Sequence, residues 1–254
     1  MKILFSVSYC LLFLFIATNL SIAQTMKPDA ARLYNEGNKF LKEGKYQQAI
    51  GVYDKALKIQ EDFRTFYQRG VALKNTGKLK EAKDSFESSI KAKPDFALAY
   101  NALGGIYFAM GKYQKAADNF QKVVDMTKNK IVKEKVQKNI AFAYAKLGDN
   151  AVSQGNPKKA ITYLKKAVEN SNYDAAYLSL AKIYSETGKY DSSLKAAENA
   201  LKYRTTIGEG GPYYYMGVAY KKKGNIAEAK KMFDIAKKDP RYKRLAKYEL
   251  TALR

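Results

Sequence analysis

The motif GKYQQA occupies residues 44–49, and five variants of it follow along the chain. These copies are GKLKEA at residues 77–82, GKYQKA at 111–116, GNPKKA at 155–160, GKYDSS at 188–193 and GNIAEA at 224–229. Their first glycines follow one another at intervals of 33, 34, 44, 33 and 36 residues. A period of this size is typical of solenoids, in which every repeat is one small unit of secondary structure. The recurrence therefore predicts a repeat protein.

Each copy has residues of fixed size at fixed distances from its first glycine, which we call the turn glycine. The residue seven positions earlier is always small: Gly37, Gly70, Gly104, Gly148, Ala181 or Gly217. The residue nine positions later is usually large: Tyr53, Phe86, Phe120, Leu164, Ala197 or Phe233. Small residues let two helix backbones approach closely, and large residues fill the neighbouring holes. We therefore predict that each unit is a helix, a tight turn at a left-handed glycine, and a second helix.

This pattern resembles the tetratricopeptide repeat. The unit that begins at Ala97 carries most of the signature residues of that family: Tyr100, Leu103, Gly104, Tyr107, Ala116, Phe120 and Val123. The resemblance covers almost the whole chain after its N-terminal segment, and it implies an all-α, right-handed solenoid of six units over residues 30–240. We expect the units near residues 30–62, 63–96, 97–130, 141–173, 174–209 and 210–240.

Three segments depart from the regular repeat. The third interval is ten residues too long, and the extra residues 131–140 have apolar side chains near helical spacing, so we expect them to extend the first helix of unit four backwards. The stretch TTIGEGGP at residues 205–212 predicts a longer, flexible loop. Residues 241–254 predict an amphipathic helix that caps the last unit, as a solenoid needs for solubility.

The first 23 residues predict a secretory signal peptide. Lys2 precedes an apolar stretch, and the small residues Ser21 and Ala23 predict cleavage after Ala23, followed by a short linker at residues 24–29. An uncleaved membrane anchor is the alternative, because residues 3–23 are long enough to cross a bilayer. A lipoprotein is disfavoured, because Cys10 lies inside the apolar stretch and follows the bulky Tyr9. We expect an exported protein, periplasmic in a Gram-negative cell.

The composition argues against catalysis. The chain has no histidine, and its one cysteine lies within the expected signal peptide. The usual general base, the thiolate nucleophile and the common transition-metal ligands are therefore missing. The glycine-rich GEGG at residues 208–211 lacks the rest of a phosphate-binding motif. We expect no enzymatic activity, no cofactor, no metal and no small-molecule substrate.

The resemblance implies a binding groove lined by the first helix of each unit, at positions ten, six and three residues before the turn glycine. The candidate groove residues are Tyr34, Asn38, Tyr67, Asn101, Phe108 and Tyr214. Only Asn38 matches the Lys, Asn and Arg clamp with which chaperone-binding members hold a terminal carboxylate. The aromatic set better suits an extended or helical peptide with apolar anchors. The alternative for each aromatic side chain is that it packs between helices.

The formal charge of +22 favours a second hypothesis. The candidate basic patch is Lys221, Lys222, Lys223, Lys230 and Lys231. An exported protein with such a patch would be attracted to an anionic envelope surface, namely lipid, lipopolysaccharide or an acidic partner. Nucleic acid is a remote alternative, because export and the lack of a nucleic-acid-binding fold argue against it. The leading hypothesis is a non-catalytic scaffold of the cell envelope that binds a peptide or protein segment in its groove.

Overall fold

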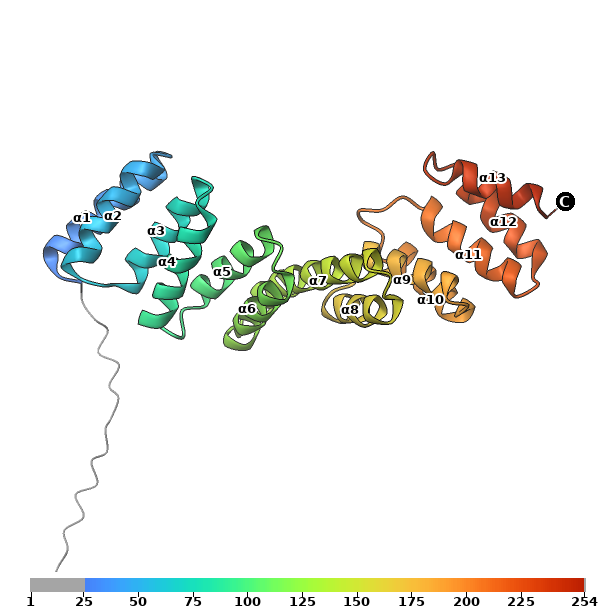
Figure 1. Cartoon of the computed structure of the whole chain (residues 1–254), viewed down its shortest axis with the longest axis horizontal. Coiled ribbons are helices and arrows are strands. Elements are labelled where there is room, and N and C mark those ends of the chain that lie inside the picture. The colour runs from blue at the N-terminus through green and yellow to red at the C-terminus, as the bar shows by residue number, and fades with distance from the viewer. Residues whose placement is uncertain (1–25, 254) are drawn as a thin grey trace, which may run out of the picture.

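The computed structural model describes residues 26–253, and within this range the chain forms thirteen α-helices and no strand. The helices stack in chain order into an elongated array, with α1 at one end and α13 at the other (Figure 1). The expected signal peptide, its cleavage site after Ala23 and the first residues of the expected linker lie outside the described residues. None of the helices within 26–253 combines the length and the apolarity that crossing a bilayer requires.

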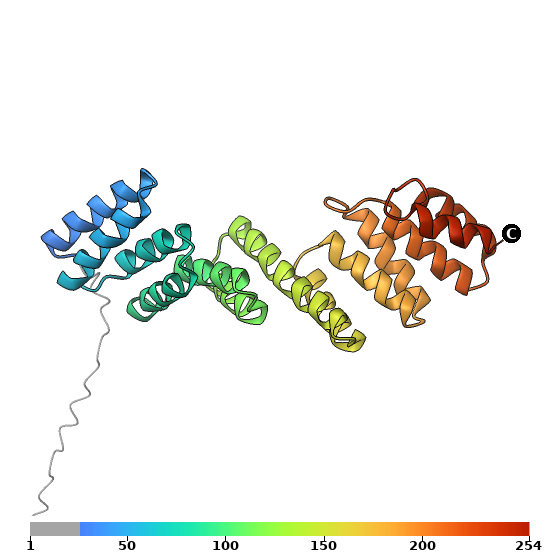
Figure 2. The ribbon, with the colours of Figure 1, turned by 45° about the horizontal axis from the view of Figure 1, so that its top comes forward.

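Twelve of the helices form six consecutive pairs, which follow one another along the array (Figure 2). The pairs are α1 (Pro28–Lys42) with α2 (Tyr46–Ile59), α3 (Phe63–Asn75) with α4 (Leu79–Ala92), α5 (Ala97–Ala109) with α6 (Tyr113–Met126), α7 (Lys130–Ser153) with α8 (Pro157–Asn170), α9 (Asp174–Glu186) with α10 (Tyr190–Lys202), and α11 (Gly210–Lys222) with α12 (Ile226–Ala236). The last helix, α13 (Lys243–Thr251), lies within the segment expected to cap the array. The predicted all-α solenoid is confirmed.

The turn glycines end the first helix of every pair. All six have φ between 66° and 79°, and no other residue within the described range has a positive φ. At Gly44 the backbone N–H of Lys45 donates to the carbonyl oxygen of Phe40 at 2.9 Å, and that of Gly44 donates to Leu41 at 3.2 Å. This pair of bonds satisfies the last carbonyl groups of the helix and needs a left-handed residue, which glycine supplies without steric cost.

The small and large residues of the repeat pack against each other within each pair. A Cβ atom added to Gly37, Gly70, Gly104, Gly148 or Gly217 would lie within 2.7 Å of the large side chain nine positions after the turn glycine, namely Tyr53, Phe86, Phe120, Leu164 or Phe233. The fifth pair has alanine at both positions, Ala181 and Ala197, and both are fully buried. Five pairs can therefore pack closely because one helix has a glycine at the contact, and the fifth pair because both residues at the contact are small.

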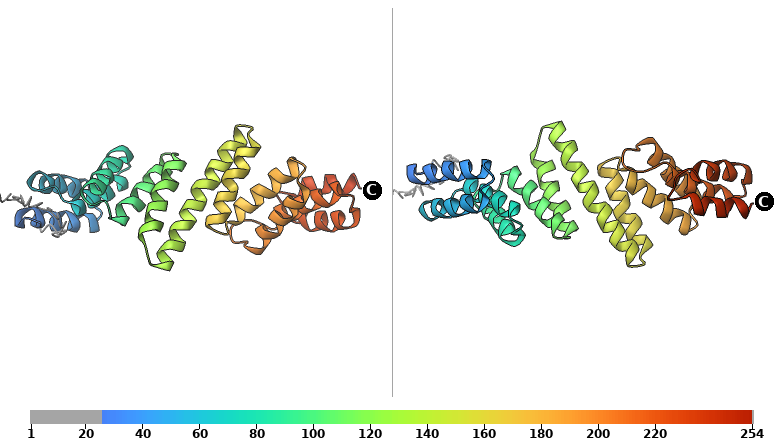
Figure 3. Two further views of the ribbon diagram at one scale, coloured as in Figure 1. Left: turned by 90° about the horizontal axis from the view of Figure 1, so that it is seen from below. Right: turned by 90° about the horizontal axis from the view of Figure 1, so that it is seen from above.

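The 24-residue α7 connects two hydrophobic cores. Its buried residues Val136 and Ile140 belong to the core that begins at α2, whereas Ala145 and Ala151 belong to the next core, which continues to α11. Residues 131–140, the expected extension, form the first half of this helix. Figure 3 shows α7 as a long oblique helix between the two halves of the array.

The stretch at residues 205–212 differs from the expected flexible loop, because α11 already begins at Gly210. Gly210 packs against the side chain of Asp239, and a Cβ atom on Gly211 would lie 2.9 Å from the hydroxyl of Tyr242 and 3.1 Å from Leu178. The glycines therefore serve close packing at the start of a helix. The sequence pattern missed this because glycine-rich segments usually indicate loops.

A buried carboxylate holds the remaining loop in place. Asp174, the fully buried first residue of α9, accepts hydrogen bonds from the backbone N–H groups of Thr205, Thr206 and Ile207 at 2.7, 2.6 and 3.2 Å. The hydroxyl of Thr206 donates a fourth bond at 2.8 Å. Burial raises the pKa of the Asp174 carboxyl, but these bonds to Thr206, Thr205 and Ile207 outweigh it and lower the pKa to about 2.

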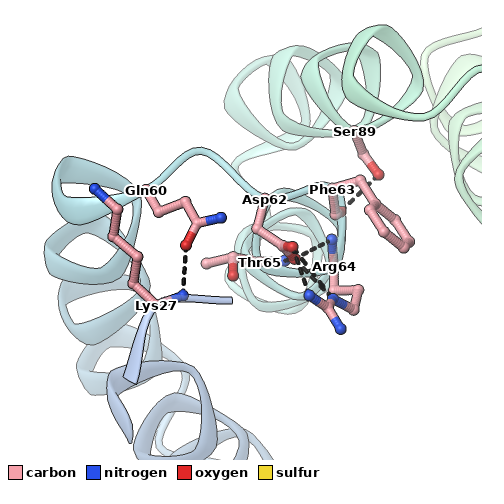
Figure 4. A network of polar contacts seen from close by, with 7 residues as sticks. All are labelled: Lys27, Gln60, Asp62, Phe63, Arg64, Thr65 and Ser89. Carbon is pink, nitrogen blue, oxygen red and sulfur yellow. Dashed lines mark hydrogen bonds and ion pairs between the residues drawn. The ribbon is translucent and has the colours of Figure 1, made fainter. Parts of the chain in front are cut away.

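A second buried carboxylate orders the link between α2 and α3 (Figure 4). Asp62 caps α3 by accepting bonds from the N–H groups of Arg64 at 2.9 Å and Thr65 at 3.3 Å, and its other oxygen accepts from the Arg64 guanidinium at 2.7 Å. In the same view, the Ser89 hydroxyl donates to the carbonyl oxygen of Phe63 at 2.8 Å. Lys27 N–H donates to the side-chain oxygen of Gln60 at 2.6 Å. The bond from Lys27 closes the ends of the first pair, the bond from Ser89 joins the two helices of the second pair, and Asp62 orders the link between these pairs.

Candidate functional groove

A row of three adjoining cavities runs along the first helices of the central units, from α3 to α9. The largest has a volume of about 460 Å³ and is lined by residues of α3, α5 and α7 together with Phe86 and Phe120. Phe108 and Phe142 line both this cavity and a second one of about 210 Å³. Asp149 and Ser179 line both the second cavity and a third one of about 260 Å³. The three cavities therefore adjoin one another along one face of the array, and together we call them the α3–α9 groove.

The repeat itself places side chains in this groove. Positions ten, six and three residues before a turn glycine are three or four residues apart, so they lie on one face of the helix. In units two and three these positions are Tyr67, Val71, Lys74, Asn101, Gly105 and Phe108, and all six line the largest cavity. In units four and five, Ala145, Asp149, Val152 and Lys182 line the two smaller cavities.

The structure brings three of the six candidate groove residues together: Tyr67, Asn101 and Phe108. Tyr67 also packs edge-on against Phe96, with ring centroids 5.3 Å apart, and its burial raises the pKa of its hydroxyl. Phe108 makes a similar edge contact with Tyr113 at 5.2 Å. Both rings are thus braced by neighbours while they line the cavity.

The other three candidates lie elsewhere. Tyr34 packs against the ring of Tyr53 at 6.3 Å, and Asn38 accepts a hydrogen bond from the Tyr53 hydroxyl at 2.8 Å. Tyr214 lies against Phe233 at 5.8 Å and against Tyr242 at 5.5 Å, next to the start of α13. These side chains make packing contacts between helices, and none of them lines the α3–α9 groove.

Two groove residues come from α7 and were missed by the sequence reasoning. Phe142 is 40% exposed, lines two of the cavities and packs edge-on against Tyr173 with ring centroids 4.8 Å apart. Asn139 lines the largest cavity one turn earlier in the same helix. Phe142 lies thirteen residues before its turn glycine, so counting one further turn back along the same face would have found it. Asn139 is present in the groove only because α7 extends beyond the regular repeat.

Polar side chains also line the groove, and some of them have no hydrogen-bond partner among the described residues. The side-chain amide of Asn75 donates to the carbonyl oxygen of Val71 at 2.8 Å. The amides of Asn101 and Asn139 have no hydrogen-bond partner within residues 26–253, and Lys74 has no carboxylate partner there. Each free amide can donate to one backbone group and accept from another. The same range contains no cluster of three or more metal-ligating side chains.

Most lysines of the candidate basic patch are paired with carboxylates. Lys221 lies 2.7 Å from Glu249 of α13, Lys231 lies 2.7 Å from Glu228, and Lys223 pairs with Asp191 of α10. Lys222 and Lys230 have no such partner among the described residues. The local positive charge of the patch is therefore smaller than the sequence alone indicates.

Comparison with known proteins places this arrangement in a family. Four tetratricopeptide repeat models match the chain, at residues 63–96, 95–172, 145–212 and 213–240, and together they span well over half of it. The search of curated proteins found no match.

Two solved structures show the same fold. YrrB, described as a TPR protein with an unusual peptide-binding site, is 22% identical over 78% of this chain and 96% of its own, with a TM-score of 0.50. MamA from Desulfovibrio magneticus RS-1, from residue 41 to its end, is 20% identical over 70% of this chain and 95% of its own, with a TM-score of 0.51. With its six register-matched helix pairs, the chain belongs to the tetratricopeptide repeat family.

Proposed function

We propose that the chain is a non-catalytic scaffold that binds a peptide segment of a partner protein in the α3–α9 groove. The observation that carries this proposal is the row of three adjoining cavities on the variable face of the repeats. The tetratricopeptide repeat is a module of protein–protein interaction, and the family membership supports this function. YrrB, which shares the fold, is described as having a peptide-binding site.

The chemistry of the largest of the three groove cavities favours a peptide with a large apolar anchor. Tyr67, Phe108 and Phe142 offer aromatic walls, and burying an apolar side chain against them removes its surface from water. The free amides of Asn101 and Asn139 can bond the peptide backbone, which fixes its position without requiring particular side chains. Lys74 at the same cavity can pair with an acidic side chain of the peptide.

A matched pair of amide variants tests this proposal. A peptide is first selected from a random display library on the folded chain, and its affinity is measured by fluorescence anisotropy. Because each amide contributes about 1 kcal/mol of net hydrogen bonding, we expect N101A/N139A to weaken binding by roughly tenfold to a hundredfold.

The control removes two exposed amides that lie on second helices, outside the groove. Asn119 and Asn170 each donate to a carbonyl oxygen of their own helix, at 2.8 and 2.9 Å. We expect N119A/N170A to bind with unchanged affinity. Equal losses in both double variants would show that the peptide does not lie in the α3–α9 groove.

The setting of this scaffold is a further part of the proposal: export to the cell envelope, supported by the signal-like residues 1–23. Cell fractionation followed by N-terminal sequencing tests it, with a periplasmic chain that begins at Gln24 as the expected result. A full-length chain in the membrane fraction would favour the N-terminal anchor instead. A cytoplasmic chain that retains Met1 would contradict export.

A further inference from the structure

The turn between α6 and α7 projects sideways from the array. Both views in Figure 3 show this turn and the first turns of α7 standing out beyond the neighbouring helices. The eight residues 128–135 are all exposed, and so is Met126, the last residue of α6. We call residues 126–135 the α7 tip.

The tip exposes large apolar side chains. Ile131 is 77% exposed, Val132 is 40% exposed, and both belong to the first turn of α7. Among the large hydrophobic side chains that are exposed within residues 26–253, Ile131 is the most exposed. Leaving such groups in water forgoes the free energy that burial provides, so packing within this chain does not explain them.

The tip is also strongly basic. It contains four lysines, Lys128, Lys130, Lys133 and Lys135, and one acidic residue, Glu134. The Glu134 carboxylate pairs only with Lys130, at 4.0 Å. Lysines at the start of a helix oppose its dipole and weaken it. The first turns of α4 and α12 carry a carboxylate, whereas that of α8, like that of α7, carries two lysines. The lysines of the tip therefore do not serve the stability of α7.

We propose that the α7 tip docks on the surface of an anionic lipid bilayer. The lysine ammonium groups lie against lipid phosphates, and Ile131 and Val132 enter the boundary between head groups and acyl chains. Lysine charges that flank exposed apolar side chains match this boundary, which is anionic outside and apolar below. A protein partner fits less well, because a stable protein interface buries about 800 Å² on each side and the tip is only a turn and two helical turns.

The proposal is independent of peptide binding, since no residue of the tip lines the α3–α9 groove. It also concerns other lysines than the candidate patch on α11 and α12. Residues 24–254 are suitable for testing it, because they contain the thirteen helices found within residues 26–253 and all the contacts described above. This segment also leaves out the apolar residues 1–23, which would bind bilayers by themselves.

A tryptophan probe tests whether the tip enters the bilayer. The chain has no tryptophan, so Ile131→Trp gives one fluorescent site, and Tyr248→Trp, at a residue of α13 that is 72% exposed, gives a matched control. We expect the emission of I131W to shift to the blue with vesicles of phosphatidylglycerol and phosphatidylcholine, and not with phosphatidylcholine alone. The emission of Y248W should stay unchanged. No shift in I131W, or equal shifts in both variants, would overturn the proposal.

A charge comparison tests which lysines carry the binding. K128Q/K130Q/K133Q/K135Q removes the tip lysines, and K158Q/K159Q/K165Q/K166Q removes four exposed lysines of α8 that have no carboxylate partner within the described range. With about fivefold in affinity expected for each lysine at the surface, the tip variant should lose at least tenfold in co-sedimentation with the anionic vesicles. The α8 variant should lose less than threefold.

Two results would contradict the proposal. Equal losses in the two lysine variants would mean that binding follows total charge. Binding of a soluble polyanion such as duplex RNA, without binding of vesicles, would point to nucleic acid as the partner. Thermal unfolding followed by circular dichroism checks that each variant is folded.

Discussion

The array uses the same repeat throughout, but its groove positions are open between α3 and α7, which we call the open half, and packed between α9 and α11, which we call the closed half. Between α3 and α7, the groove positions line a cavity of about 460 Å³, and Gly105 has open space above it. Between α9 and α11, Gly211 brings the next first helix against Leu178, which occupies a groove position in unit five. Tyr214, the equivalent residue of unit six, is packed against Tyr242. The spacing of successive first helices thus decides whether a groove position can bind a partner.

Asp174 joins α9 to the loop of the closed half. Its carboxylate holds the loop that leads into α11, with three backbone N–H groups and a hydroxyl donating to it. We expect D174A to lower the free energy of unfolding by about 3–5 kcal/mol, because it removes four hydrogen bonds between a buried carboxylate and the loop. Urea unfolding followed by circular dichroism measures the loss. D149A removes an exposed carboxylate from the open half and should change the stability by less than about 0.5 kcal/mol.

Alanine variants of Phe142 and Tyr214 should separate the effect on peptide affinity from the effect on the free energy of unfolding. We expect F142A to weaken the selected peptide by roughly tenfold while costing about 1 kcal/mol of stability, because its ring is partly exposed in the groove. Y214A should cost about 2–3 kcal/mol through lost packing and leave the affinity of the folded protein unchanged. Anisotropy and urea unfolding give the two quantities. A loss of affinity in Y214A alone would reverse the assignment of open and closed halves.

Two glycine variants probe the spacing of the helices directly. Gly211→Ala adds a methyl group about 3 Å from Leu178 and from the Tyr242 hydroxyl, so we expect it to destabilise the chain by about 1–2 kcal/mol. Gly105→Ala adds the same group where nothing lies within 4 Å. It should stabilise the chain by up to about 1 kcal/mol, because alanine favours a helix over glycine. Equal effects in thermal unfolding would mean that the two regions are packed alike.

Acidity should weaken the closed half specifically. Because the folded pKa of Asp174 is about 2, below the ordinary value of 3.8, its carboxylate stabilises the fold above about pH 4. This contribution is lost progressively as the pH falls towards 2. We therefore expect the difference in unfolding free energy between the native chain and D174N to shrink from pH 5 to pH 2. A difference that stays constant over this range would contradict the assigned role.

The sequence predicted correctly those features of the fold that depend on contacts within one repeat. The turn at Gly44 and the packing of Gly37 against Tyr53 involve residues close in sequence, so spacing alone reveals them. The openness of the groove depends on how far α5 lies from α7, which no single repeat specifies. The ion pair between Lys221 and Glu249 joins two residues that are 28 positions apart in the sequence. The hydrogen bonds of Asp174 reach loop residues that are 31 to 33 positions away. Such contacts are set by the assembled array.

Nuclear magnetic resonance of asparagine side chains tests the peptide site most directly. The chain is labelled with ¹⁵N-asparagine, and the side-chain amide signals are followed while the selected peptide is added. If the peptide lies in the α3–α9 groove, the signals of Asn75, Asn101 and Asn139 shift, while those of Asn35 and Asn38 in α1, outside the groove, stay in place. Shifts confined to Asn35 and Asn38, with the groove amides unchanged, would contradict the account.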